Sequence, residues 1–228
     1  MSIEKDYNNF PDRDISDISS ETIRPEIKEK FNQIWDLALS YQDKRDDEGH
    51  AESVLQFVSK LTELEEADED IAVPAAILHD IGWSKVPKEE AMKNFGNKIG
   101  NNTKIELQKK HEEIGVEMAR EILEKINYDA DMTNEILEII SAHDTREEFV
   151  SKNEGVMRDA DKLWRFSEKG FWLDVERGSY TPEGRYEMLK EKIDSPDFFY
   201  SESAKKIARK ELEKREKEFN NKKTVRNN

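Results

Sequence analysis

Cysteine is missing from the whole chain of 228 residues. This absence excludes disulfide bonds, zinc sites built on thiolates and iron–sulfur clusters held by cysteine. Long apolar runs are missing too, since no stretch approaches the ~20 residues of a membrane span. The polar, acidic start MSIEKDYNNFPDRD does not resemble a signal peptide. We therefore expect a soluble, cytoplasmic protein without a membrane partner.

Positive charge is scarce relative to negative charge. The chain has 37 Lys and Arg residues against 52 Asp and Glu residues, which gives a formal net charge of −15. Such a chain repels nucleic acid and anionic membranes unless its charge is locally reversed, so we expect no nucleic-acid partner. It also repels phosphorylated small molecules. A site for an anionic substrate would therefore need bound cations or a local group of Lys and Arg side chains.

Apolar residues are sparse but sufficient for a core. They make up 35% of the chain, against 39% charged residues, yet four Trp and ten Phe argue for a packed interior. No alternating β pattern extends beyond a few residues, so the predicted fold class is all-α. We divide the chain into a flexible or loosely docked N-terminal arm (1–23), one helical domain (24–200) and a charged C-terminal helix and tail (201–228).

Apolar residues at helical spacing predict a series of helices. They lie near residues 25–42, 49–61, 73–81, 104–127, 132–142, 155–166 and 201–219. The third helix should begin near Val73, with Pro74 in its first turn and Gly82 just past its end. Asp131 or Thr133 is expected to cap the helix at 132–142.

Two segments outside this regular pattern have expected roles. Residues 84–103 form a long connection rich in Asn and Gly, and loops of that length are often lids or binding loops. The helix at 201–219 has only a thin apolar stripe, which predicts weak packing on the domain or on a partner.

The chain has only four histidines, and each falls at the end of a predicted helix, near its end or within it, beside apolar neighbours: His50, His79, His111 and His143. One such histidine is more often a hydrogen-bonded core residue than a ligand. Here, however, the chain places no histidine on its abundant polar surface. Imidazole is the commonest metal ligand in proteins, and converging imidazoles and carboxylates build the metal sites of helical bundles. The four histidines together therefore predict a metal site.

Carboxylates are available to complete such a site. Asp80 is adjacent to His79, and both Asp159 and Asp161 lie in the segment RDADKL. Helical periodicity makes the last two candidates for an inward face without separating them. Histidine and carboxylate ligands without thiolates suit Mn, Fe, Co, Ni or Zn.

These residues resemble the signature of the HD-domain metal-dependent phosphohydrolases. His50, the doublet His79-Asp80 and Asp161 are similar to the pattern H…HD…D of that family, and HDIG at 79–82 is a frequent form of the doublet. The segment ADKL at 160–163 resembles the last motif of the family, and that match selects Asp161 over Asp159. The resemblance spans about residues 49–166.

The other two histidines narrow the resemblance. His111 and His143 match the extra histidines of subfamilies that hold two metals, H…HD…H…H…D. The chain lacks the Gly-Tyr-Pro triplet of the HD-GYP phosphodiesterases, which argues against hydrolysis of cyclic di-GMP. The single-metal 5′-nucleotidase branch is a poorer match, because it does not need these two histidines. The best match is a small stand-alone HD hydrolase.

The resemblance implies a fold, a ligand set and a reaction. The fold is the HD helical bundle with a charged C-terminal helical extension. Asp80 would bridge two divalent transition metals per chain, one held also by His50, His79 and Asp161, and the other by His111 and His143. A metal-activated water would then hydrolyse a phosphoester or phosphoanhydride of a small phosphorylated metabolite, with a nucleotide expected. Asp80 would accordingly be catalytic as well as a metal ligand.

A phosphate group also needs fixed donors. Lys85 and Arg146 are the candidates, because each follows a ligand-bearing helix end by a few residues. Against this, exposed Lys and Arg residues are mostly solvated surface. Trp83, Trp164 and Trp172 could stack on a base, although aromatic residues near a site are more often core.

Two other functions fit the same residues. One is a degenerate HD module that binds a nucleotide or regulates without turnover, although a degenerate site would be expected to lack a ligand. The other is a di-iron oxygenase on the HD scaffold. The substrate, the native metal and the oligomeric state are open at this point, including whether the chain forms a homo-oligomer.

Overall fold

The structure is a computed structural model that describes residues 29–92, 100–178 and 180–226. Within these ranges every regular element is a helix, so the predicted all-α class is confirmed. The expected N-terminal arm (1–23) lies outside the described residues. The α-helices are α1 (Glu29–Ala38), α2 (His50–Glu65), α3 (Glu69–Leu78), α4 (Lys88–Ala91), α5 (Asn101–Lys125), α6 (Ala130–Ile140), α7 (Lys152–Leu163), α8 (Glu168–Glu176), α9 (Pro182–Ile193) and α10 (Glu202–Arg226). Three short 3₁₀ helices are η1 (Leu39–Tyr41), η2 (Ile81–Lys85) and η4 (Trp164–Phe166).

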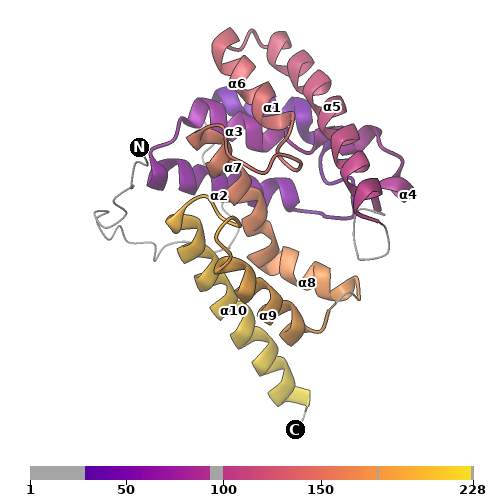
Figure 1. The fold of residues 1–228 in the computed structure, drawn as a ribbon, viewed down its shortest axis with the longest axis vertical. Helices are drawn as coiled ribbons and strands as arrows, with labels where there is room; N and C mark the ends of the chain where they lie inside the picture. Colours follow the sequence, from indigo (N-terminus) through magenta and orange to yellow (C-terminus); the bar gives the residue numbers. More distant parts are fainter. Residues whose placement is uncertain (1–28, 93–99, 179, 227–228) are drawn as a thin grey trace.

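Helices α2, α3 and α7 form the centre of the core. α2 packs on α3 and α7, and α3 also packs on α6. Every residue of α3 from Ile71 to Leu78 is buried, as expected for a helix that is apolar on all sides. Figure 1 shows α8, α9 and α10 gathered at one end of the molecule, with α7 running between them and helices α1–α6.

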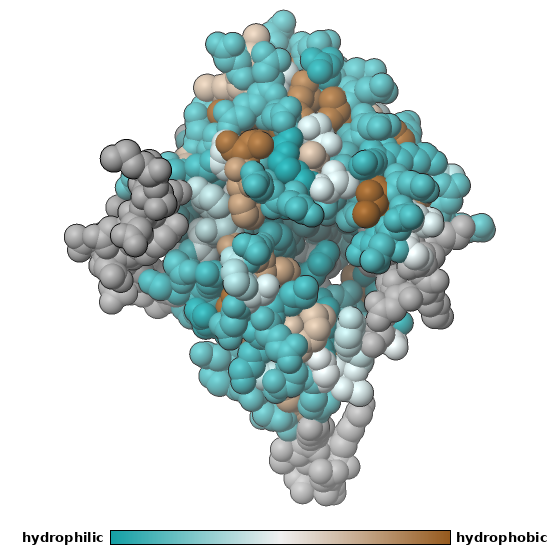
Figure 2. Space-filling model, viewed as in Figure 1, coloured by the Kyte–Doolittle hydropathy of each residue, from teal (hydrophilic) through white to brown (hydrophobic). Residues whose placement is uncertain are grey.

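The surface agrees with the charged composition. The face drawn in Figure 2 is mostly hydrophilic, and its hydrophobic patches are small and separate. Among the described helices, none has both the length and the apolar character that a membrane span requires.

Helix α3 begins four residues earlier than the sequence pattern indicated. Asp68 caps it by accepting a hydrogen bond from the Asp70 amide, which places Pro74 inside the helix instead of in its first turn. A proline there leaves the carbonyl four residues earlier without its usual donor. The Tyr128 hydroxyl supplies that donor, at 2.7 Å from the Asp70 carbonyl oxygen. A tertiary contact therefore makes the interior proline tolerable.

Gly82 has a different role from the predicted one. It was expected just past the end of a helix, but it lies inside η2, which packs on α5. A Cβ atom at this position would be 2.0 Å from the His111 carbonyl oxygen and 2.7 Å from the Gly115 amide nitrogen. The glycine is therefore needed for the close approach of η2 to α5.

Other boundaries differ in smaller ways. The cap of α6 is Asp129, whose carboxylate accepts from the amides of Asp131 and Met132, so the prediction of Asp131 or Thr133 was wrong. Part of the predicted lid at 84–103 is helical, in η2, α4 and the start of α5. Residues 93–99 of that connection lie outside the described part of the chain.

The C-terminal helix is packed more firmly than its sequence indicated. α10 packs on α9, α7 and α2, and its stripe of buried apolar residues comprises Ala204, Ile207, Ala208, Leu212 and Phe219. The two residues before it are also fixed, because the Asp159 carboxylate accepts hydrogen bonds from the amides of Tyr200 and Ser201 and from the Ser201 hydroxyl. The division of the chain at residue 200 stays a prediction.

Candidate metal centre

Four of the six predicted ligands form a first compact group. The Nε2 atoms of His50 and His79 are 3.3 Å apart. The Asp80 Oδ2 atom lies 3.4 Å and 3.6 Å from these two nitrogens. The Asp161 Oδ1 atom lies 3.5 Å and 3.6 Å from the same nitrogens. Two imidazole nitrogens and two carboxylate oxygens therefore face a common point.

The other two histidines form a second group on the far oxygen of Asp80. The Nε2 atoms of His111 and His143 are 3.3 Å apart, and the Asp80 Oδ1 atom lies 3.5 Å from each. Asp80 thus presents one oxygen to each pair of histidines. This is the arrangement expected of a carboxylate that bridges two cations.

The spacing of the donor atoms fits a divalent transition metal. The nitrogens of His50 and His79 lie 3.3 Å apart, and each lies 3.4–3.6 Å from Asp80 Oδ2 and Asp161 Oδ1, which is a spacing that donor atoms around one zinc-like ion can have. The second group offers three such atoms and leaves room for further ligands. Nitrogen and oxygen donors without sulfur suit Mn, Fe, Co, Ni or Zn.

Backbone carbonyls set the tautomer of two of the histidines. His79 Nδ1 is 2.8 Å from the Ala76 carbonyl oxygen, and His143 Nδ1 is 2.9 Å from that of Ile140. Because a carbonyl oxygen only accepts, each Nδ1 must carry the proton. In the neutral imidazole the lone pair is then on Nε2, directed at the centre, as metal ligation requires.

The charges of the centre perturb its titrations. Burial would raise the pKa of Asp80, but the Arg45 guanidinium, the His79 charge and hydrogen bonds from His111 and His143 hold that pKa well below its usual range. Burial would lower the pKa of His143, yet the hydrogen bond to Asp80 and the charge of Asp144 raise it to about 9. The carboxylates thus stay anionic and attract positive charge, either protons on imidazole or metal ions.

Two tryptophans pack against the ligands. Trp83 donates its indole N–H to Asp80 Oδ1 at 3.1 Å and stacks on the His111 ring, with centroids 4.1 Å apart. Trp164 meets the His50 ring edge-on at 5.4 Å. Trp83 is only 2% exposed, so it orients ligands and is not available as a stacking platform for a base.

Glu112 ties the two histidines of the second group together. It follows His111 on α5, is buried, and accepts hydrogen bonds from the amides of Asp144 and Thr145 and from the Thr145 hydroxyl. These residues follow His143 directly. Charge-assisted bonds of this kind are strong, so they hold the turn after α6 against α5.

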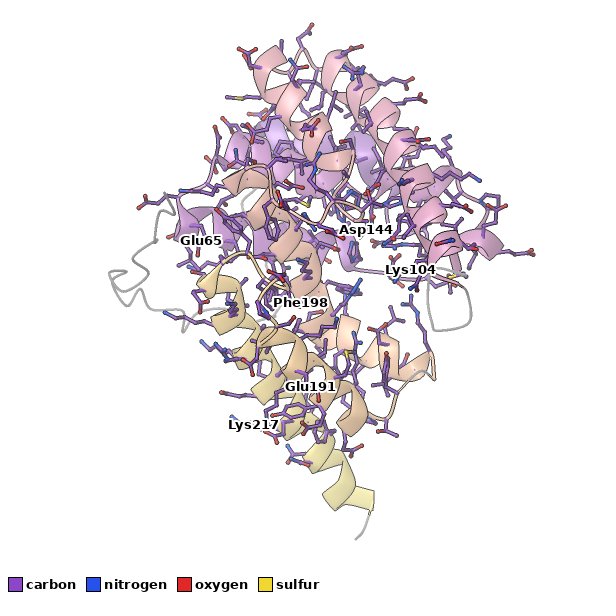
Figure 3. The ribbon with its side chains drawn as sticks, viewed as in Figure 1. Glu65, Lys104, Asp144, Glu191, Phe198 and Lys217 are labelled. Carbon is purple, nitrogen blue, oxygen red and sulfur yellow. The ribbon has the colours of Figure 1, made fainter. Side chains whose placement is uncertain are left out.

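The structure separates the two aspartates of RDADKL. Asp161 faces the first group of ligands, whereas Asp159 points to the start of α10. Asp144, which follows His143, has its Oδ2 atom 3.8 Å from His111 Nε2 and lies at the edge of the second group. Figure 3 shows Asp144 near the middle of the molecule.

The two predicted phosphate-binding residues lie among other partners. The terminal nitrogens of Arg146 pair with Glu138 and Glu154, both outside the histidine groups. The Lys85 ammonium lies over the Tyr41 ring, 5.6 Å from its centroid. Whether either residue binds phosphate stays a prediction.

Sequence reasoning missed one basic residue at the centre. The Arg45 guanidinium pairs with the Oδ2 atom of Asp80, the oxygen that faces the first group. Arg45 lies five residues before His50 in the acidic loop DKRDDEG. That proximity was the available signal, but the loop reads as a solvated turn because it is mostly charged.

The model of the HD domain family matches residues 48–165. A crystal structure of a predicted HD superfamily hydrolase from an uncultured Thermotogales bacterium aligns with a TM-score of 0.56 and 22% sequence identity, over 90% of this chain and 94% of that one. Identity at this level shows a shared fold. No curated protein matches the chain.

Proposed function

Because the chain belongs to the HD domain family, we propose that it is a metal-dependent phosphohydrolase. Its substrate would be a phosphoester or phosphoanhydride of a small metabolite, with nucleotides as the first class to test. The observation that carries the proposal is the position of Asp80, whose two oxygens each lie 3.4–3.6 Å from one pair of histidine nitrogens. This placement supports a centre in which one carboxylate would serve two cations.

The residues divide into two sets of ligands. His50, His79 and Asp161 would hold one cation together with Asp80 Oδ2, and His111 and His143 would hold the other together with Asp80 Oδ1. Bound divalent cations lower the pKa of a water molecule and neutralise charge on phosphoryl oxygens.

The chain's own groups prepare this centre for an anion. Trp83 fixes the orientation of Asp80 through a hydrogen bond to its Oδ1 atom. The four histidines are buried, so their nitrogens are shielded from bulk water. A protein of net charge −15 would otherwise repel a phosphorylated substrate, and cations at this point reverse the local charge.

The test is an assay of purified protein against a panel of nucleotides and a generic phosphomonoester, with Mn, Fe, Co, Ni or Zn added separately. Two equivalents of metal per chain are expected, and His79→Ala should lose metal and turnover together. The proposal fails if no substrate turns over with any metal and His79→Ala leaves the metal content unchanged. Tight nucleotide binding without turnover would instead indicate a binding module.

A further inference from the structure

Arg45 contacts Asp80, Asp47 and Trp83 at the edge of the first ligand group. Its Nη2 atom donates to Asp80 Oδ2, and its Nε atom lies 3.4 Å from Asp47 Oδ2. The centre of its guanidinium lies over the Trp83 ring at 4.9 Å. The side chain is only 12% exposed, and it lines a pocket together with His50 and His79. These contacts fix the orientation of the Arg45 guanidinium.

The backbone of Arg45 is fixed as well. Asp43 and Asp46 on either side of it have positive φ angles of 55°, a conformation that non-glycine residues adopt at a cost of about 1 kcal/mol. Arg177 donates to the carbonyl oxygens of Arg45 and Asp46, at 3.0 Å and 2.9 Å. The guanidinium is therefore presented by a rigid loop, and little conformational entropy remains to be lost when it binds a ligand.

The contact of Arg45 with Asp80 conflicts with a bound cation. Asp80 Oδ2 is the oxygen that completes the first ligand group, at 3.4 Å and 3.6 Å from the nitrogens of His50 and His79. A guanidinium and a divalent cation on the same oxygen repel each other. The pairing of Arg45 Nε with Asp47 does not involve Asp80 Oδ2, so it does not conflict with a cation there.

We propose that Arg45 exchanges partners when the centre is loaded with metal. It then binds the phosphoryl oxygens of the substrate in place of Asp80. The planar fork of arginine matches phosphate in a bidentate contact, which the point charge of lysine does not. This inference rests on the proposed phosphohydrolase function and names Arg45 as its residue for recognising the phosphoryl group.

The experiment measures two affinities by calorimetry in the full chain: Mn²⁺ for the metal-free protein, and inorganic phosphate for the Mn²⁺-loaded protein. Arg45→Gln should weaken phosphate binding roughly tenfold or more, because a charge-assisted contact is lost. The same variant should bind Mn²⁺ at least as tightly as the wild type, because a competing cation is gone. The phosphate affinity of Arg45→Lys should lie between those of the wild type and Arg45→Gln. Arg209→Gln is the control, because Arg209 pairs with Asp194 on the surface, and it should change neither the Mn²⁺ affinity nor the phosphate affinity.

Three results would overturn the inference. The first is unchanged phosphate affinity in Arg45→Gln, and the second is a wild type that does not bind phosphate with Mn²⁺ present. The third is weakened Mn²⁺ binding in Arg45→Gln, which would mean that the arginine only positions Asp80. If Arg45→Gln does not fold by circular dichroism, Arg45→Lys carries the test, since it keeps the charge and removes the fork.

The two proposals fail separately. Turnover of a phosphorylated substrate without Arg45-dependent phosphate binding would overturn this inference and leave the phosphohydrolase in place. Phosphate binding that depends on Arg45, in a protein that turns over no substrate, would overturn the phosphohydrolase proposal and leave the role of Arg45 in phosphate binding in place.

Discussion

At the scale of single residues, two aspartates two positions apart on α7 have opposite surroundings. Asp161 lies 3.5–3.6 Å from two histidine nitrogens, while Asp159 accepts three hydrogen bonds at the start of α10. Asp161 is thus surrounded by candidate metal ligands, whereas Asp159 is surrounded by hydrogen-bond donors that fix the start of α10. The two side chains should therefore respond differently to the same chemical change.

Replacing each aspartate by asparagine tests this difference. Asp161→Asn should lose metal from the first group, and it should also lower the free energy of unfolding of the metal-free protein, because, despite burial, His79 and His50 hold the pKa of Asp161 below its usual range. Asp159→Asn should keep its metal and lose about 1–3 kcal/mol, because an amide N–H then faces a backbone donor. Metal analysis and urea unfolding of both variants give the answer. The reverse pattern of metal loss would contradict the assignment of Asp161 as the ligand.

At the scale of elements, the approach of η2 to α5 sets the distance between His79-Asp80 and His111. Gly82→Ala should force these elements apart, because its Cβ atom would be 2.0 Å from the His111 carbonyl oxygen. We expect a loss of at least about 2 kcal/mol in the free energy of unfolding and weaker metal binding by the second group. Gly100→Ala is the matched control, since no atom lies within 4 Å of its added Cβ. Equal effects of the two substitutions would refute the packing argument.

The interior proline of α3 gives a second prediction at this scale. Tyr128→Phe should cost about 1–2 kcal/mol, because it removes the donor to the Asp70 carbonyl. In a Pro74→Ala background the helix regains its own N–H at that position, so Tyr128→Phe should then cost less. Chemical unfolding of the four proteins of this double-mutant cycle measures the coupling. A cost that is independent of residue 74 would show that the hydroxyl does not compensate for the proline.

Elements also show which features the sequence could predict. The clustering of the six candidate ligands was predictable because their motifs have fixed residue types, and helical spacing placed them on buried faces. Arg45 was not, because two left-handed aspartates turn its loop toward the site, and aspartate gives no clear signal for that conformation. Pro74 and α10 were misjudged for a related reason, since the compensating hydroxyl and the packing partners come from distant segments.

At the scale of the whole molecule, the six candidate ligands lie on segments that make up most of the core. They come from α2, the end of α3, α5, the turn after α6, and α7. A metal that binds the folded chain and not the unfolded chain must therefore stabilise all of these elements together. At a free metal concentration of ~100 times Kd, the gain is about 2.7 kcal/mol for one site.

Thermal unfolding in the presence and absence of a chelator tests this expectation. The Tm of the wild type should rise with added Mn²⁺ and fall after its removal. Asp80→Asn, which weakens both groups of ligands, should show a much smaller response. An equal response in the two proteins would indicate that the stabilising metal binds elsewhere.

The hydrogen bonds of Asp159 bear on how the chain is trimmed for laboratory work. The family match ends at residue 165, and the last ligand is residue 161, so a shortened chain ending near residue 166 would keep every ligand. It would also strip Tyr200 and Ser201 from a buried carboxylate two positions before that ligand. A chain that ends near residue 166 would therefore contain all six candidate ligands, but we expect a chain that also includes Tyr200 and Ser201 to be needed for a stable fold around them.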